Sequence, residues 1–155
     1  MRSVTYTTAE GREQILDALV LAADEIALAL AELSEAYEHL DEQTAERLEE
    51  ALFAPVQTAY GRAKRTHAEF AQRSELPART FAMPGQVAPS TAAKQLIERA
   101  LEALTRADLG LAGLQDSMLP VEVGDAELRS GLAEVRELAE RVRPQARELV
   151  RTLGR

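Results

Sequence analysis

The chain has 155 residues, of which 46% are hydrophobic and 28% charged, and its formal net charge at pH 7 is −8. This is the length of one ordinary domain with the composition of a folded chain, and the lack of cysteine excludes disulfides and cysteine nucleophiles. The negative charge disfavours binding to nucleic acid or anionic lipid, because the phosphate term would be repulsive. We therefore expect one domain over residues 1–155, in a cytoplasmic protein without a nucleic-acid or membrane partner, since no signal-peptide or transmembrane pattern is present.

The first half of the chain predicts two long helices. Thr7 and Glu10 have the spacing of a capping box, and nothing breaks the helical pattern from there, which predicts a helix over about residues 8–40. Asp41 is a suitable N-cap for a second helix over about residues 42–73.

The second half predicts a linker and two more helices. The linker, residues 74–89, contains three prolines and a glycine and cannot continue as helix. Ser90 is then expected to cap a helix over about 91–118, and Asp125 to cap a last helix over about 126–153. No stretch has the alternation and turn spacing of strands.

Apolar residues at heptad spacing predict how these helices pack. In the last helix these positions are Leu128, Leu132, Val135, Ala139, Val142, Ala146, Leu149 and Leu153. In the third helix they are Ile97, Ala100, Leu104, Ala107, Leu111, Leu114 and Met118. If the connections are short turns, neighbours are antiparallel, which predicts an all-α, up-down-up-down four-helix bundle. The alternative is two helical hairpins that complete a bundle only by dimerising.

One surface of the first helix carries more apolar residues than a core requires. Leu21 and Leu28, one heptad apart, fall on the side opposite the core stripe, and Leu109 of the third helix also points away from its core. The acids on the same side of the first helix are Asp17, Asp24, Glu25 and Glu32. Isolated surface leucines are common, but the pattern also fits an apolar strip that binds a second copy or a protein partner.

A flank of the second helix offers an alternative site. Phe53, Tyr60 and His67 repeat at seven-residue spacing beside the core stripe, and Pro55 among them removes a backbone hydrogen bond and is expected to kink the helix. With Phe81 of the linker, these residues are candidates for a small-ligand groove. The linker itself is either a fixed cover or a mobile lid.

The sequence offers little material for catalysis or metal binding. Neither His39 nor His67 follows a glutamate by three residues, as the histidines of di-metal carboxylate bundles do. Arg129, Arg136 and Arg143 repeat every seven residues among glutamates and are interpreted as a solvated face. We therefore expect no cofactor, no metal and no enzymatic activity, but an interaction or assembly module acting through the first helix. A ligand sensor or carrier is the alternative.

Overall fold

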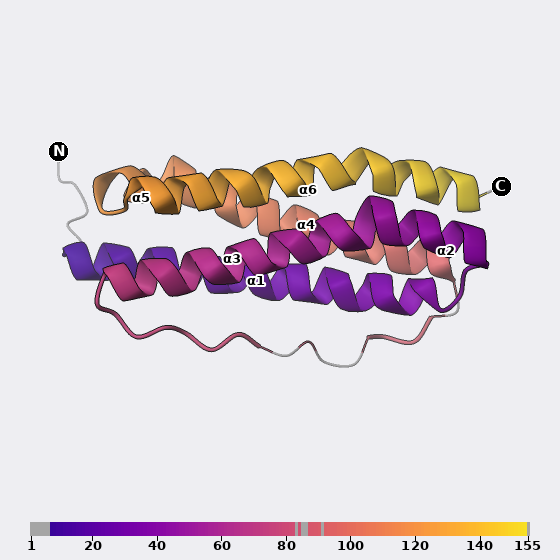
Figure 1. Cartoon of the computed structure of the whole chain (residues 1–155), viewed down its shortest axis with the longest axis horizontal. Helices are drawn as coiled ribbons and strands as arrows, with labels where there is room; N and C mark the ends of the chain where they lie inside the picture. Colours follow the sequence, from indigo (N-terminus) through magenta and orange to yellow (C-terminus); the bar gives the residue numbers. More distant parts are fainter. Residues whose placement is uncertain (1–6, 83, 85–86, 91, 155) are drawn as a thin grey trace.

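The computed structural model describes residues 7–82, 84, 87–90 and 92–154, and within these ranges every regular element is helical and no strand occurs. The all-α prediction is confirmed. The elements are α1 (Thr8–Tyr37), α2 (Glu42–Leu48), the π-helical turn η1 (Glu49–Phe53), α3 (Ala54–Arg73), α4 (Ala93–Asp116), α5 (Leu119–Glu122) and α6 (Ala126–Leu153). Figure 1 shows the long helices lying side by side. In the described part of the chain, none of them has the length and apolar character needed to cross a bilayer.

The capping box at the start of α1 forms as predicted. The Thr7 hydroxyl accepts the backbone N–H of Glu10 at 3.0 Å, and the Glu10 carboxylate accepts the N–H of Thr7 at 2.9 Å. The helix ends at Tyr37, three residues before the predicted end. The N–H of His39 bonds the carbonyl of Ala36, three residues back, and this tightening closes the last turn.

Helices α2, η1 and α3 follow one another without a break. Asp41 caps α2 by accepting the N–H of Thr44 at 2.9 Å. Before Pro55 the chain widens into the π-helical turn, in which the N–H of Ala54 bonds the carbonyl of Glu49, five residues back. Proline has no N–H for the ordinary helical bond to Ala51, so its disturbance is absorbed by one π-helical turn.

The predicted up-down-up-down order is wrong. Figure 1 shows that α3 ends and α4 begins at opposite ends of the molecule, so these two helices run in the same direction. The prediction assumed a short turn between them. The 19 residues between Arg73 and Ala93 can extend to roughly 60 Å, more than the ~48 Å of a 32-residue helical segment. The linker can therefore run the length of the helices.

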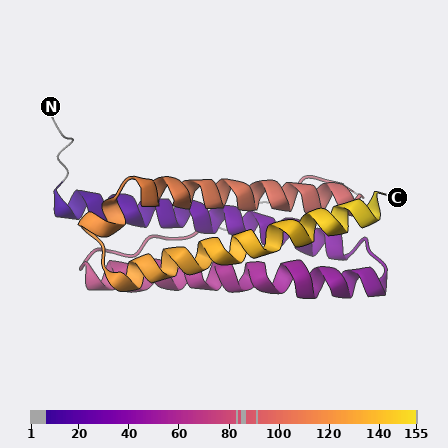
Figure 2. The ribbon, with the colours of Figure 1, turned by 90° about the horizontal axis from the view of Figure 1, so that it is seen from above.

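Ion pairs between the helices show which of them are antiparallel neighbours. On one side, Arg73 pairs with Asp125 at 2.7 Å and Arg62 with Glu134, which places α3 antiparallel to α6. On the other side, Arg106 of α4 pairs with Glu25 of α1 at 3.0 Å. A second pair between α1 and α4 joins Arg99 to Glu32 at 3.7 Å. Helices α1 and α6 each pack against both α3 and α4, so α1 lies diagonal to α6 (Figure 2).

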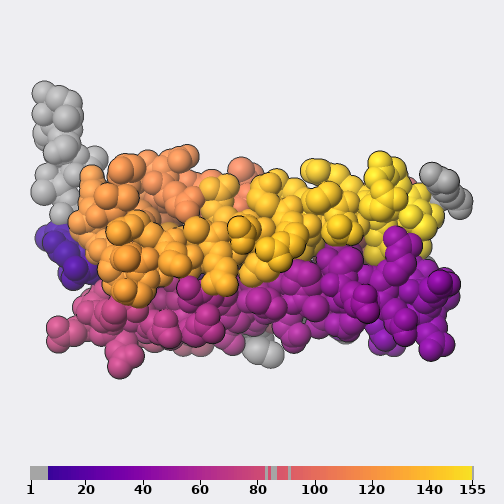
Figure 3. All heavy atoms as spheres, turned by 45° about the horizontal axis from the view of Figure 1, so that its top comes forward, coloured from indigo at the N-terminus to yellow at the C-terminus, as the bar shows by residue number. Residues whose placement is uncertain are grey.

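The predicted core positions are largely confirmed. The heptad residues of α6 are buried from Leu128 to Leu149, and only Leu153 at the end is half-buried. In the third predicted helix the exception is Met118, which is exposed because α4 ends at Asp116 and Met118 takes a left-handed backbone conformation with φ 68°. The space-filling view shows the side chains of α6 meeting those of α2 and α3 along their length (Figure 3).

The starts of the last two long helices differ in how they are capped. Ser90, the predicted cap of α4, is not its N-cap. That residue is Ala92, whose N–H donates to the Ser90 hydroxyl at 3.1 Å. Asp125 caps α6 as predicted and accepts the N–H of Leu128 at 2.8 Å. Between α4 and α6, the short helix α5 closes one end of the molecule.

Candidate functional site

Two of the three leucines predicted to meet a partner are exposed. Leu21 of α1 is 68% exposed and Leu109 of α4 is 64% exposed. Leu28 is half-buried and packs against the core. The exposed leucines therefore do not follow one helix, as the heptad spacing of Leu21 and Leu28 indicated, but lie on two neighbouring helices.

Ion pairs between α1 and α4 bring these two leucines to the same level. Glu25 pairs with Arg106, and Glu32 lies 3.7 Å from Arg99, so residue numbers fall along α4 as they rise along α1. This register places Leu21 level with α4 residues 109 and 110. A hollow of about 310 Å³ lies between the two helices at this level, and its lining is Ala18, Leu21, Ala22, Glu25, Arg106 and Gly110. We call Ala18, Leu21, Leu109 and Gly110 the Leu21 surface.

A second hollow lies on the other side of Leu21. Its volume is about 460 Å³, and it lies between α1 and the linker, where Val20, Arg79 and Thr80 form part of the wall. Leu21 lines both hollows. Its side chain is therefore a ridge with a depression on either side, which is the shape that interlocks with another helical surface.

The first part of the linker is bonded to α1, and we call residues 74–82 the strap. The Arg79 guanidinium donates to the Asp17 carboxylate at 3.0 and 3.1 Å and to the carbonyl of Glu13 at 3.4 Å. The backbone N–H of Ala82 donates to the Asp24 carboxylate at 3.1 Å. Two of the acids predicted to edge an apolar strip thus hold the strap.

The other two acids of that group face α4. Glu25 forms the ion pair with Arg106, whose pKa is raised by the hydrogen bond from its guanidinium to this carboxylate. Glu32 is buried, and burial raises its pKa, although the charge of nearby Arg99 opposes the shift. All four acids are therefore engaged by the strap or by α4 and do not form a free acidic edge.

His67 is completely buried under the strap. Its Nε2 atom accepts a long hydrogen bond of 3.4 Å from the backbone N–H of Arg79, and its ring meets the Phe81 ring edge to face at 5.0 Å. Its Nδ1 atom is buried and has no hydrogen-bond partner in the structure. Burial lowers the pKa of His67, and the positive charge of Arg79 lowers it further. These contacts place a neutral imidazole at the centre of the strap's seat.

The candidate ligand groove is only partly assembled. Lys64 Nζ lies 4.8 Å from the Tyr60 ring and 5.7 Å from the Phe81 ring, which brings these side chains together over His67. Phe53 and Pro55, both half-buried, lie in and beside the π-helical turn, about three to four helical turns from His67. The space over His67 is filled by Phe81 of the chain itself.

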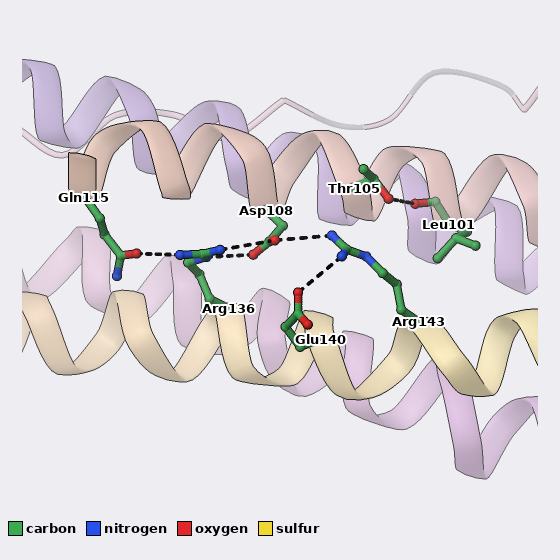
Figure 4. Close-up of polar contacts among 7 residues, drawn as sticks. All are labelled: Leu101, Thr105, Asp108, Gln115, Arg136, Glu140 and Arg143. Carbon is green, nitrogen blue, oxygen red and sulfur yellow. Dashed lines mark hydrogen bonds and ion pairs between the residues drawn. The ribbon is translucent and has the colours of Figure 1, made fainter. Parts of the chain in front are cut away.

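A polar cluster that sequence reasoning missed lies between α4 and α6. Asp108 is only 5% exposed and accepts from Arg136 at 2.8 Å and from Arg143 at 3.2 Å (Figure 4). Arg136 also donates to Gln115 at 2.7 Å, and its pKa is raised by the hydrogen bond to Asp108. The interpretation of the α6 arginines as a solvated face is therefore wrong for Arg136 and Arg143. The sequence did contain one signal of a buried acid, because Asp108 directly follows the predicted core position Ala107.

Among the described residues, no three histidine or carboxylate side chains are grouped so as to hold a metal ion. Comparison with protein-family models, with curated proteins and with solved structures finds no match to this chain. The Leu21 surface and the strap are the two candidate sites that the geometry of the chain favours.

Proposed function

We propose that the chain is a non-enzymatic four-helix-bundle interaction module that self-associates through the Leu21 surface. One observation carries the proposal. Among the described residues, Leu21 and Leu109 are the most exposed large apolar side chains, and they lie level with each other on adjacent helices. Two isolated leucines need no explanation, but two exposed leucines at the same level of adjacent helices, with small residues nearby, favour a binding surface.

The shape of this surface favours a second copy as its partner. A two-fold axis through an interface makes each copy present the same patch, so the patch must be complementary to itself. Leu21 supplies a ridge, and the small residues Ala18, Ala22 and Gly110 line the hollow next to it. The Leu21 ridge of one copy fits the hollow of the other, as ridges fit grooves between packed helices.

The charges around the patch also favour self-association. Two copies of a chain with net charge −8 repel each other at long range. At the edges of the Leu21 surface, however, Asp17 is paired with Arg79 and Glu25 with Arg106. Because Asp17 and Glu25 each have a cation, these two acids bring no unpaired negative charge to the contact.

The test is the mass of the protein in solution. We expect the native chain to show a dimer whose fraction rises with concentration in sedimentation velocity and in native mass spectrometry. The double variant Leu21→Glu, Leu109→Glu places two charges in each patch and is expected to remain a monomer with unchanged helix content by circular dichroism. The matched control is Val121→Glu, because Val121 is similarly exposed at 57% but lies on α5.

Two outcomes would contradict the proposal. If the double variant dimerises as the native chain does, the interface lies elsewhere. If the native protein is monomeric at every concentration, self-association is wrong. A monomer with added mass from a co-purified small molecule would instead favour the alternative of a ligand carrier using the flank of α3.

A further inference from the structure

The strap is held to the helices by a small number of polar bonds that end on titratable groups. Asp17 and Asp24 of α1 accept from Arg79 and from the N–H of Ala82. His67 of α3 accepts the N–H of Arg79 and supports the Phe81 ring. Of these acceptors, only the histidine belongs to a residue type that ordinarily changes charge between about pH 5 and 8.

The contact with His67 requires the neutral ring. A neutral imidazole has one nitrogen that accepts, and here Nε2 faces an N–H donor. Protonation turns both ring nitrogens into donors, so the N–H of Arg79 would face another N–H group. The surrounding charges do not favour a protonated His67. Arg79 of the strap and Lys64 of α3 are positive, and the carboxylate of Asp17 on α1 is already paired with Arg79.

We propose that the strap is acid-operated: protonation of His67 releases residues 74–82 from α1 and α3 and uncovers the apolar seat of Phe81. The helices themselves remain packed, because the bonds lost are those between the strap and the helices. This proposal does not depend on self-association through the Leu21 surface.

The direction of the pH dependence follows from the burial of His67. Its pKa is lowered in the docked state, so the docked strap binds fewer protons than the released strap. Falling pH therefore favours release. Docking is strongest above the ordinary histidine pKa of 6.5 and weakens as the pH falls below it.

A tryptophan reporter tests the proposal, because the chain has no tryptophan of its own. In Phe81→Trp the indole replaces the ring that packs on His67, and its emission reports whether that seat is occupied. We expect emission typical of a buried indole at about pH 7.5 and a red shift on acidification to about pH 5. Far-UV circular dichroism is expected to stay constant over the same range.

A second reporter is needed because tryptophan is larger than phenylalanine and could itself weaken the docking of the strap. Thr80 is exposed, and the chain has no cysteine, so Thr80→Cys carries a single fluorophore beside an unchanged Phe81. Its anisotropy is expected to fall on acidification at the same midpoint. The NMR titration of the His67 ring is expected to share that midpoint.

The other histidine provides the matched control. His39 lies exposed near the end of α1 beside Glu35, so His39→Gln is expected to leave the transition unchanged. His67→Gln is expected to remove it, whether the strap of that variant is docked or released at every pH. The proposal is overturned if neither reporter responds to pH, if the response persists in His67→Gln, or if His39→Gln abolishes it.

Discussion

Thr66 of α3 lies directly against Gly131 of α6, so that these two helices approach each other without a side chain on the α6 side. A Cβ atom added at Gly131 would lie closest to Oγ1 of Thr66 and 2.7 Å from its Cγ2, nearer than real Cβ atoms come to other atoms. The Thr66 hydroxyl is buried at this contact and has no hydrogen-bond partner in the structure. The contact fixes how closely α3 and α6 pack.

We expect Gly131→Ala to destabilise the fold by about 1–3 kcal/mol, because overpacking outweighs the gain in helix propensity. Chemical denaturation measures the change. Gly61→Ala in α3 is the control: its added Cβ meets nothing within 4 Å, so the substitution should stabilise by about 0.5–1 kcal/mol. Adding Thr66→Ala to Gly131→Ala should recover most of the loss. If the changes in unfolding free energy caused by Thr66→Ala and Gly131→Ala simply add in the double variant, the contact between the two residues is not the cause of the destabilisation.

The Asp108 cluster predicts a large loss of stability on removal of one charge. In Asp108→Asn, Arg136 and Arg143 keep their positions but lose the shared carboxylate. We expect a loss of about 3 kcal/mol, at the low end for buried ion pairs because both guanidinium groups are partly exposed. Thermal and urea unfolding measure it. The exposed Asp116→Asn on the same helix should change stability by less than about 0.5 kcal/mol, and an equal effect of both variants would contradict the prediction.

Asp125 predicts part of the acid sensitivity of the fold. Its pKa is lowered, first by the hydrogen bond from Arg73 and also by the N–H of Leu128 that it caps. The stability that it contributes is therefore present above its ordinary pKa of 3.8 and is lost as the pH falls through the lowered value.

We expect Asp125→Ala to cost about 1 kcal/mol near neutral pH, as loss of a helix cap does, and to show a smaller further loss on acidification. Urea midpoints measured from about pH 7 to pH 2 test this. Glu127→Gln is the control, because Glu127 is exposed and lies 4.0 Å from the same arginine. If the stability of Asp125→Ala falls as steeply on acidification as that of the native chain, Asp125 is not a source of the acid sensitivity.

Loss of the Phe81 ring predicts a looser strap on intact helices. We expect Phe81→Ala to increase trypsin cleavage after Arg79 about fivefold, if the ring contributes about 1 kcal/mol to docking and cleavage follows the open population. Asp17→Asn should have the same direction of effect, because it weakens the hold on Arg79. Cleavage after the exposed Arg141 of α6 serves as the internal reference. If cleavage after Arg79 and cleavage after Arg141 are accelerated by the same factor, the whole fold has been destabilised and the prediction fails.

The starts of three helices and the core were predictable because both depend on residues close in sequence. The capping box at Thr7, the Asp41 and Asp125 caps and the heptad core of α6 are all local patterns, and the structure confirms them. Pro55 was predicted to kink its helix, and the structure shows a π-helical turn directly before it. The sequence by itself thus determined which segments are helical and which face of each is buried.

Tertiary structure alone decided how the helices are ordered and which polar groups meet. The length of the linker permits either a turn at one end or a path along the molecule, and α3 and α4 are parallel because the chain takes the second. That choice set Arg79 on Asp17 and Phe81 on His67. It also brought Leu109 level with Leu21. Local periodicity places a residue on a face of its own helix, but it carries no information about which helix, or which part of a linker, will lie opposite that face.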